Sequence, residues 1–226
     1  MHKLAASGCE VYLNARDREA AERAAADQER ATGGRVTAVP GDVSRPEVLP
    51  GILRDVARRH GHVDILVHCA VSLHRMQATA PQPEEMRQDF DVAVAPLLYS
   101  ASVLPTVMPH GRGRVVAVSS SGAGRVVPAY VSLGMAKGAL ETLVRYLGAE
   151  LAPSGTTVNA VSTARMDRGR TAEDDPVAAS LAARTPAGRL TQPDDVADTV
   201  ALLCTDEASW LHGQVITVDG GLGLVG

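Results

Sequence analysis

Lysine is nearly absent from this sequence of 226 residues: Lys3 and Lys137 are its only lysines, and arginine supplies the rest of its 22 basic residues. Aromatic residues make up only 3%, no basic run is interleaved with them, and the formal net charge is −4. No nucleic-acid partner is expected, since binding to phosphates requires a positively charged surface. No apolar run approaches the roughly 20 residues of a membrane-spanning helix, and no secretory leader is found, so we expect a cytoplasmic protein.

The sequence is also poor in cysteine. Cys9, Cys69 and Cys204 lie far apart and show no CxxC or Cys/His spacing. This pattern implies no disulfide framework and offers no metal site. Hydrophobic residues, by contrast, make up 45% of the chain, which is enough for one well-cored domain over residues 1–226.

Short β-branched runs alternate with longer helical patterns along the chain. Because parallel strands need crossover connections, this alternation predicts an α/β protein with a doubly wound parallel sheet, covered by helices on both faces. The predicted strands are 10–14, 35–39, 63–67, 114–119, 156–161 and 214–218, and the predicted helices are 18–30, 46–60, 84–108 and 129–151.

The rare Lys137 lies seven residues after Tyr130, in the predicted helix 129–151. Seven residues make two turns of α-helix, so the two side chains are expected on one face, about 10 Å apart along the axis. A phenol and an ammonium placed in this way can contact one bound molecule. The pair alone leaves open a lysine placed at the surface by chance.

Five motifs, in their order and separation, resemble the short-chain dehydrogenase/reductase family over nearly the whole chain. They are 41–43 after a strand, 63–67 before a turn, Ser119–Ser120 at a strand end, Lys137 on the next helix, and 215–221 as the last strand and turn. The resemblance implies a Rossmann-like fold and an oxidoreductase that uses a nicotinamide cofactor.

Standard members of that family carry the catalytic tyrosine four residues before the lysine, where this sequence has Leu133. The position of Tyr130, together with 138–147 and 185–189, resembles the enoyl-thioester reductase branch, especially enoyl-acyl-carrier-protein reductase III. The resemblance implies NADPH-dependent reduction of a 2-enoyl thioester, carried on acyl carrier protein or coenzyme A, in fatty-acid or polyketide metabolism.

The same resemblance suggests roles for three side chains. Tyr130 is expected to stabilise the negative charge that develops on the thioester oxygen in the transition state. Lys137 is expected to bond the nicotinamide ribose, and Ser120 matches the family's catalytic serine. Ser120 fits equally well as a cap of the turn at the strand end, and Tyr130 as an aromatic residue packed on a loop.

Four further residues are candidate cofactor contacts. Arg16 follows the first predicted strand, where a cation favours a ribose 2′-phosphate and therefore NADPH, although it also fits a solvated arginine. The resemblance implies that Asp42 and Val43 flank the adenine of the cofactor. The alternative for Asp42 is that it caps the end of the strand. Ala70 lies in the turn after the third predicted strand.

The sequence departs from the family in several places. The first eight residues resemble the end of the helix that follows the family's first strand and glycine-rich turn, so we expect a domain truncated at its N-terminus whose sheet lacks that strand. Where the family has an Asn-Asn-Ala-Gly turn, this sequence has His-Cys-Ala-Val at 68–71. Ala93 replaces the family's helix asparagine, and Thr163–Ala164 replaces the Pro-Gly that follows the sixth strand. His68 is expected to be a core residue rather than an acid or base.

These departures motivate two alternatives. One is a degenerate scaffold without redox activity, which serves as a binding partner or as a non-redox catalyst on a tethered acyl intermediate. The other, a ketoreductase, is disfavoured because Leu133 has no hydroxyl. Family members pair through the helix that carries the lysine and through the last strand, so the resemblance also implies a homodimer or homotetramer.

Overall fold

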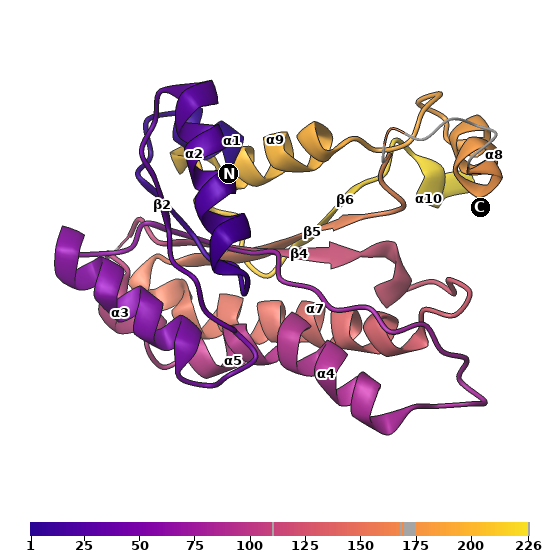
Figure 1. Ribbon diagram of the computed structural model, residues 1–226, viewed down its shortest axis with the longest axis horizontal. Coiled ribbons are helices and arrows are strands. Elements are labelled where there is room, and N and C mark those ends of the chain that lie inside the picture. The colour runs from indigo at the N-terminus through magenta and orange to yellow at the C-terminus, as the bar shows by residue number, and fades with distance from the viewer. Residues whose placement is uncertain (110, 168, 170–174, 226) are drawn as a thin grey trace. The chain divides into compact units, whose positions relative to one another are not determined.

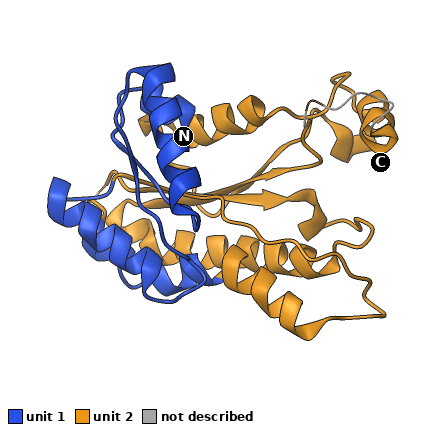
Figure 2. Cartoon of the chain, viewed as in Figure 1, with its two compact units in different colours: residues 1–63, 95–107 blue, residues 64–94, 108–226 orange. Residues whose placement is uncertain are grey.

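The computed structural model describes residues 1–109, 111–167, 169 and 175–225. The strands of this part of the chain all pair in parallel, and they form two sheets with the orders β1-β2 and β3-β4-β5-β6. The chain divides into two compact units, one of residues 1–63 and 95–107 and one of residues 64–94 and 108–226 (Figure 2).

The second unit contains the four-stranded sheet. Its strands are β3 (Ile65–His68), β4 (Arg114–Ser120), β5 (Thr157–Thr163) and β6 (Val215–Val218). Its helices are α4 (Pro83–Ala93), α7 (Val131–Leu151), α8 (Pro176–Arg184), α9 (Pro193–Leu203) and α10 (Leu222–Val225), with 3-10 turns η1 (Ser121–Ala123), η2 (Ala152–Ser154) and η3 (Asp206–Ala208).

Helices cover both faces of this sheet. Helix α7, with α4 beside it, packs on one face and α9 packs on the other (Figure 1). Every residue of β5 is buried, as expected for a parallel strand covered on two sides. The core on the α9 face consists of Val116, Val161, Val196, Val200 and Leu203.

The first unit is built around two short strands, β1 (Val11–Leu13) and β2 (Val36–Ala38). Its helices are α1 (His2–Ala6), α2 (Arg18–Thr32), α3 (Val48–His60), α5 (Ala95–Ser100) and α6 (Leu104–Val107). The small alanine side chains of α2 allow it to pack closely on α1 and β2. Ala25 of α2 forms a buried cluster with Ala5 and Val36.

The expected fold class is confirmed, because parallel strands alternate with helices and both faces of the larger sheet are covered. Within the described residues, no strand joins the β1-β2 pair to the β3–β6 sheet. The described helices include none that is long and apolar enough to cross a membrane.

The prediction of a single helix over 84–108 is wrong. The chain forms α4, α5 and α6 instead, with a break at Val94 and another at 101–103. Pro96 and Pro105 explain the breaks, since proline donates no backbone hydrogen bond and its ring clashes with the carbonyl four residues earlier.

Candidate active site at the ends of β4 and β5

The carboxyl ends of β4 and β5 bring two hydroxyl side chains together. Ser120 and Thr163 are the last residues of these strands and face each other in the parallel register. Ser120 Oγ accepts a hydrogen bond of 3.3 Å from the backbone N–H of Gly122 and so caps the turn η1. The buried Thr163 Oγ1 has no partner in the described chain. An unpaired buried hydroxyl is costly, so Thr163 Oγ1 is a group that a polar ligand or a water can satisfy.

Tyr130 lies just before α7, not within it. The helix begins at Val131, and Tyr130 is its N-cap residue, so the premise that Tyr130 and Lys137 share one helical face is corrected. The preceding residue, Ala129, has φ of +56°, a left-handed conformation that is unfavourable for a residue with a Cβ. Such strained positions concentrate at functional sites.

The ring of Tyr130 packs on the turn that follows β4. A Cβ built on Gly122 would lie 2.5 Å from Cε1 and 2.6 Å from Cδ1 of Tyr130, so no side chain larger than hydrogen fits at that position. Burial raises the pKa of the Tyr130 phenol, a hydrogen bond from Ser120 acts in the opposite direction, and the charge of Asp89 raises the pKa further. The phenol therefore remains a hydrogen-bond donor well above neutral pH.

Lys137 is buried in α7, with only 4% of its surface exposed. Its Nζ donates a hydrogen bond of 2.6 Å to the backbone carbonyl of Val118 in β4. Burial lowers the pKa of Lys137 to about 8, while the negative groups nearby, including Glu141, act in the opposite direction. The ammonium is thus held against β4 with two further N–H groups available to a ligand. A chance surface lysine is excluded.

The turn after β3 contains Ala70, which is half-buried, and the exposed Cys69. His68 is buried, and its Nε2 lies 2.9 Å from the carbonyl oxygen of Ala93. Burial lowers the pKa of His68 to about 4, so the ring is neutral at pH 7 and Nε2 donates to that carbonyl. His68 is therefore a hydrogen-bonded core residue, as its sequence position predicts.

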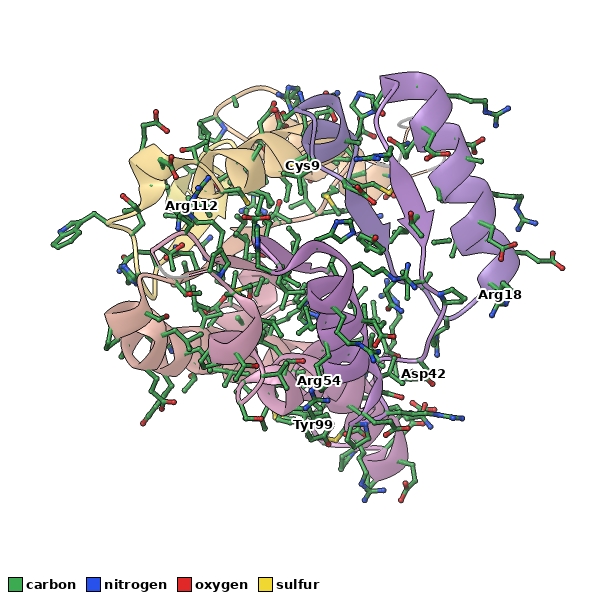
Figure 3. The ribbon with its side chains drawn as sticks, turned by 90° about the vertical axis from the view of Figure 1, so that its left-hand side faces the viewer. Cys9, Arg18, Asp42, Arg54, Tyr99 and Arg112 are labelled. Carbon is green, nitrogen blue, oxygen red and sulfur yellow. The ribbon has the colours of Figure 1, made fainter. Side chains whose placement is uncertain are left out.

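The other predicted cofactor contacts belong to the first unit. Arg16 is exposed after β1, and Val43 is buried. Asp42 lies in the loop between β2 and α3 (Figure 3) and accepts hydrogen bonds from Ser44, at 3.1 Å from N and 2.8 Å from Oγ. The side-chain bond from Ser44 lowers the pKa of Asp42, and the charge of Arg16 contributes. The observed contact of Asp42 is thus a turn cap, and its contact with adenine stays a prediction.

Three residues of the candidate site were not predicted from the sequence, namely His74, Asp89 and Ser132. Asp89 is fully buried in α4 and lies one turn before Ala93, the other buried residue of that helix. A carboxylate on the apolar face of a helix is a signal that was available in the sequence. His74 and Ser132 carry no such signal, because only the tertiary structure brings them to Asp89.

Comparisons with known proteins show the family of this chain. Residues 2–223 match the family model described as enoyl-(acyl carrier protein) reductase. The 1-cyclohexenylcarbonyl-CoA reductase of Streptomyces collinus is 33% identical over 228 residues, which cover 98% of this chain and 81% of the relative. The enoyl-(acyl-carrier-protein) reductase (NADH) FabI of Synechocystis is 30% identical over 198 residues, which cover 83% of this chain and 75% of the relative.

The fold also matches solved structures. A short-chain type dehydrogenase/reductase from Mycobacterium ulcerans superposes with a TM-score of 0.91 at 27% identity, covering 99% of this chain and 84% of the other. The family and its relatives are oxidoreductases. The chain belongs to the enoyl-(acyl carrier protein) reductase family of short-chain dehydrogenases/reductases.

Proposed function

We propose that this protein reduces the double bond of a 2-enoyl thioester, carried on coenzyme A or acyl carrier protein, with NADPH as the hydride donor. The main observation that supports this proposal is the position of the Tyr130 phenol. Tyr130 lies at the N-terminus of α7 beside Ser120, whereas Leu133, at the position of the tyrosine in standard members, is buried in the core with 2% of its surface exposed. A ketoreductase mechanism has no hydroxyl at that position.

The residues of the second unit fit the nicotinamide end of such a cofactor. Lys137 has donors for ribose hydroxyls, and the unpaired Thr163 Oγ1 offers a hydrogen bond to a polar group at the end of β5. The bound cofactor supplies a hydride to the β carbon. In the first unit, the exposed Arg16 supports NADPH by its charge. The relative from Synechocystis is named as an NADH enzyme, so NADH is the alternative.

The residues of this chain have separate tasks in the reaction. The raised pKa of Tyr130 keeps its hydroxyl as a donor toward the thioester oxygen, where negative charge develops. The ammonium of Lys137 favours that charge electrostatically. Ser120 accepts from Gly122 in the turn on which the Tyr130 ring packs, so we assign it mainly to holding that ring in place.

Exposed apolar side chains support an acyl substrate. Val126 and Val127 precede Tyr130, with 96% and 40% of their surfaces exposed, and Val71 and Leu73 are exposed at 53% and 42% in the segment after β3. The two segments meet where the backbone N–H of Met76 donates to the carbonyl of Ala129 at 3.2 Å. Apolar side chains in such a cluster favour contact with a hydrocarbon chain over a small polar substrate. They do not form the closed apolar wall that would enclose it.

The proposal is tested with matched thioesters. NADPH oxidation is followed with crotonyl-CoA, which has a conjugated double bond, and with acetoacetyl-CoA, which has a ketone at the same carbon. We expect turnover of crotonyl-CoA and little or none of acetoacetyl-CoA. The reverse preference would establish a ketoreductase and reject the enoyl assignment. Repeating the assay with NADH distinguishes the two nucleotides.

The second candidate function is a scaffold without redox activity that binds a tethered acyl intermediate. It is favoured by the separate β1-β2 and β3–β6 sheets and by the His68–Cys69–Ala70–Val71 turn. Saturable binding of crotonyl-CoA without oxidation of either nucleotide is the result that would support it.

We also propose that the protein forms homodimers or homotetramers through α7 and the C-terminal segment. Leu140, Val144, Leu147 and Leu151 are buried within the chain and leave no surface for a partner. Tyr146 in α7 and Leu224 in α10, by contrast, are 65% and 89% exposed. Light scattering at micromolar concentration measures the mass, and a monomer would reject this interface.

A further inference from the structure

A buried carboxylate ties three segments of the second unit together. Asp89 in α4 has no exposed surface. One of its oxygens lies 2.8 Å from Nδ1 of His74, and the other accepts from Ser132 Oγ at 2.6 Å and from the backbone N–H of His74 at 3.1 Å. Although burial alone would raise the pKa of Asp89, the hydrogen bonds from Ser132 and His74 lower it. The group is therefore a carboxylate at neutral pH.

An ionised Asp89 determines how the hydrogen atoms of His74 are arranged. A carboxylate only accepts hydrogen bonds, so Nδ1 of His74 carries a hydrogen and donates it to Asp89. The second nitrogen, Nε2, makes no hydrogen bond with another described residue, and 30% of the side chain is exposed. An aspartate that orients a histidine in this way fixes which ring nitrogen faces it and leaves the far nitrogen to exchange protons.

This pair lies beside Tyr130. Ser132 is two residues after Tyr130, and Met76, two residues after His74, forms a parallel bridge with Tyr130. The charge of Asp89 acts on the phenol as one cause of its raised pKa. A histidine oriented by a buried carboxylate therefore lies on the segment that pairs with Tyr130, the group that we assign to the substrate oxygen.

We propose that His74, oriented by Asp89, delivers a proton to the α carbon of the substrate after hydride has been added to the β carbon. This inference rests on the proposed function, because it requires an enoyl thioester as substrate. The reaction also needs a second proton carrier. The phenol of Tyr130 stays protonated while it stabilises the substrate oxygen, so another group must supply the proton that the α carbon takes up.

The step balances with these groups. Hydride addition at the β carbon moves the π electrons onto the thioester oxygen and forms an enolate, whose oxygen accepts a hydrogen bond from Tyr130. The α carbon then takes the proton from Nε2 of the His74 imidazolium, and the C–H bond forms as the carbonyl is restored. The neutral imidazole regains a proton from water through its exposed surface. One hydride and one proton are consumed for each double bond.

The test replaces His74 by asparagine. His74→Asn keeps a donor near Asp89, in place of Nδ1, but has no group that carries a proton. With crotonyl-CoA and NADPH in D₂O, we expect the wild-type protein to place deuterium at the α carbon in one configuration. In the variant we expect kcat to fall about 100-fold or more and both configurations to appear, because solvent then protonates the free enolate.

Several controls separate the possible outcomes. His2→Asn changes an exposed histidine of the first unit that hydrogen-bonds Gln28, and it is expected to behave as wild type. Should His74→Asn fail to fold by circular dichroism, His74→Gln provides the same test with the amide one carbon further out. Added imidazole is expected to restore part of the rate in the variant that folds.

The two proposals fail in different ways. Wild-type protein that does not reduce crotonyl-CoA would reject the proposed function, and the role of His74 with it. Wild-type turnover together with an unchanged rate and a single α configuration in the folded His74 variant would overturn only the role of His74, and would leave Asp89 and His74 as supports of the segment after β3.

Discussion

The two units of this protein position their predicted site residues in different ways. In the second unit, Lys137 is buried and bonded to β4, and Tyr130 is pressed onto Gly122. In the first unit, Arg16 is exposed and Asp42 bonds only within its own turn. Groups that must meet a reacting atom require fixed geometry, whereas a charge that selects a nucleotide acts at the surface. Packing thus favours the second unit as the site of chemistry.

Among the three variants that compare the two units, the largest effect is expected where packing on Tyr130 is tightest. In Gly122→Ala the new Cβ would lie 2.5 Å from a ring carbon, so the ring must move. Because displacements of about 1 Å in a catalytic group can cost about 100-fold in rate, we expect kcat for crotonyl-CoA to fall 10- to 100-fold. Gly124→Ala, in the same turn with no atom within 4 Å, is the matched control and is expected to keep its rate within twofold. Equal rates in the two variants would show that the ring is not held by this turn.

A smaller effect, on stability, is expected at Lys137. Since burial lowers its pKa to about 8 from the ordinary 10.5, the unfolded chain binds more protons than the native protein between these values. The charged side chain therefore destabilises the fold below pH 8, and this cost disappears as the pH rises toward 10.5. Lys137→Met is expected to raise the free energy of unfolding by about 2 kcal/mol at pH 7, with a reduced gain near pH 10. Urea unfolding at the two pH values measures this, and a destabilised variant at pH 7 would contradict it.

The smallest effect is expected in the first unit. Arg16→Glu replaces the proposed 2′-phosphate partner by a like charge, so we expect the Kd of NADPH to rise about tenfold while that of NADH changes little. Arg18→Glu is the matched control, since Arg18 is an exposed arginine nearby in sequence that pairs with Glu22 at 3.4 Å (Figure 3). Equal losses for both nucleotides, or for both variants, would remove Arg16 from the choice of cofactor.

The sequence was sufficient for the elements with a strong local pattern. The strands at 114–119 and 156–161 were placed within two residues, because buried parallel strands are continuous apolar runs bounded by turns. The helix expected over 84–108 failed because the apolar pattern outweighed Pro96 and Pro105. The start of α7 was missed by two residues, and this moved Tyr130 from the helix to its cap.

Residues of the candidate site that lie in one segment could be proposed from the sequence, and their role stays a prediction. Tyr130 and Lys137 are neighbours in sequence, and their spacing was readable. Asp89, His74 and Ser132 come from three segments, and no local pattern predicts that they meet. The division of the strands into two sheets is likewise visible only in the structure.

The most direct test of the central claim is the substitution Tyr130→Phe, which removes one hydroxyl and keeps the ring on Gly122. With crotonyl-CoA and saturating NADPH, we predict a fall in kcat of about 100-fold or more, with NADPH affinity and unfolding midpoint nearly unchanged. A Tyr130→Phe protein that reduces crotonyl-CoA at the wild-type rate would contradict it.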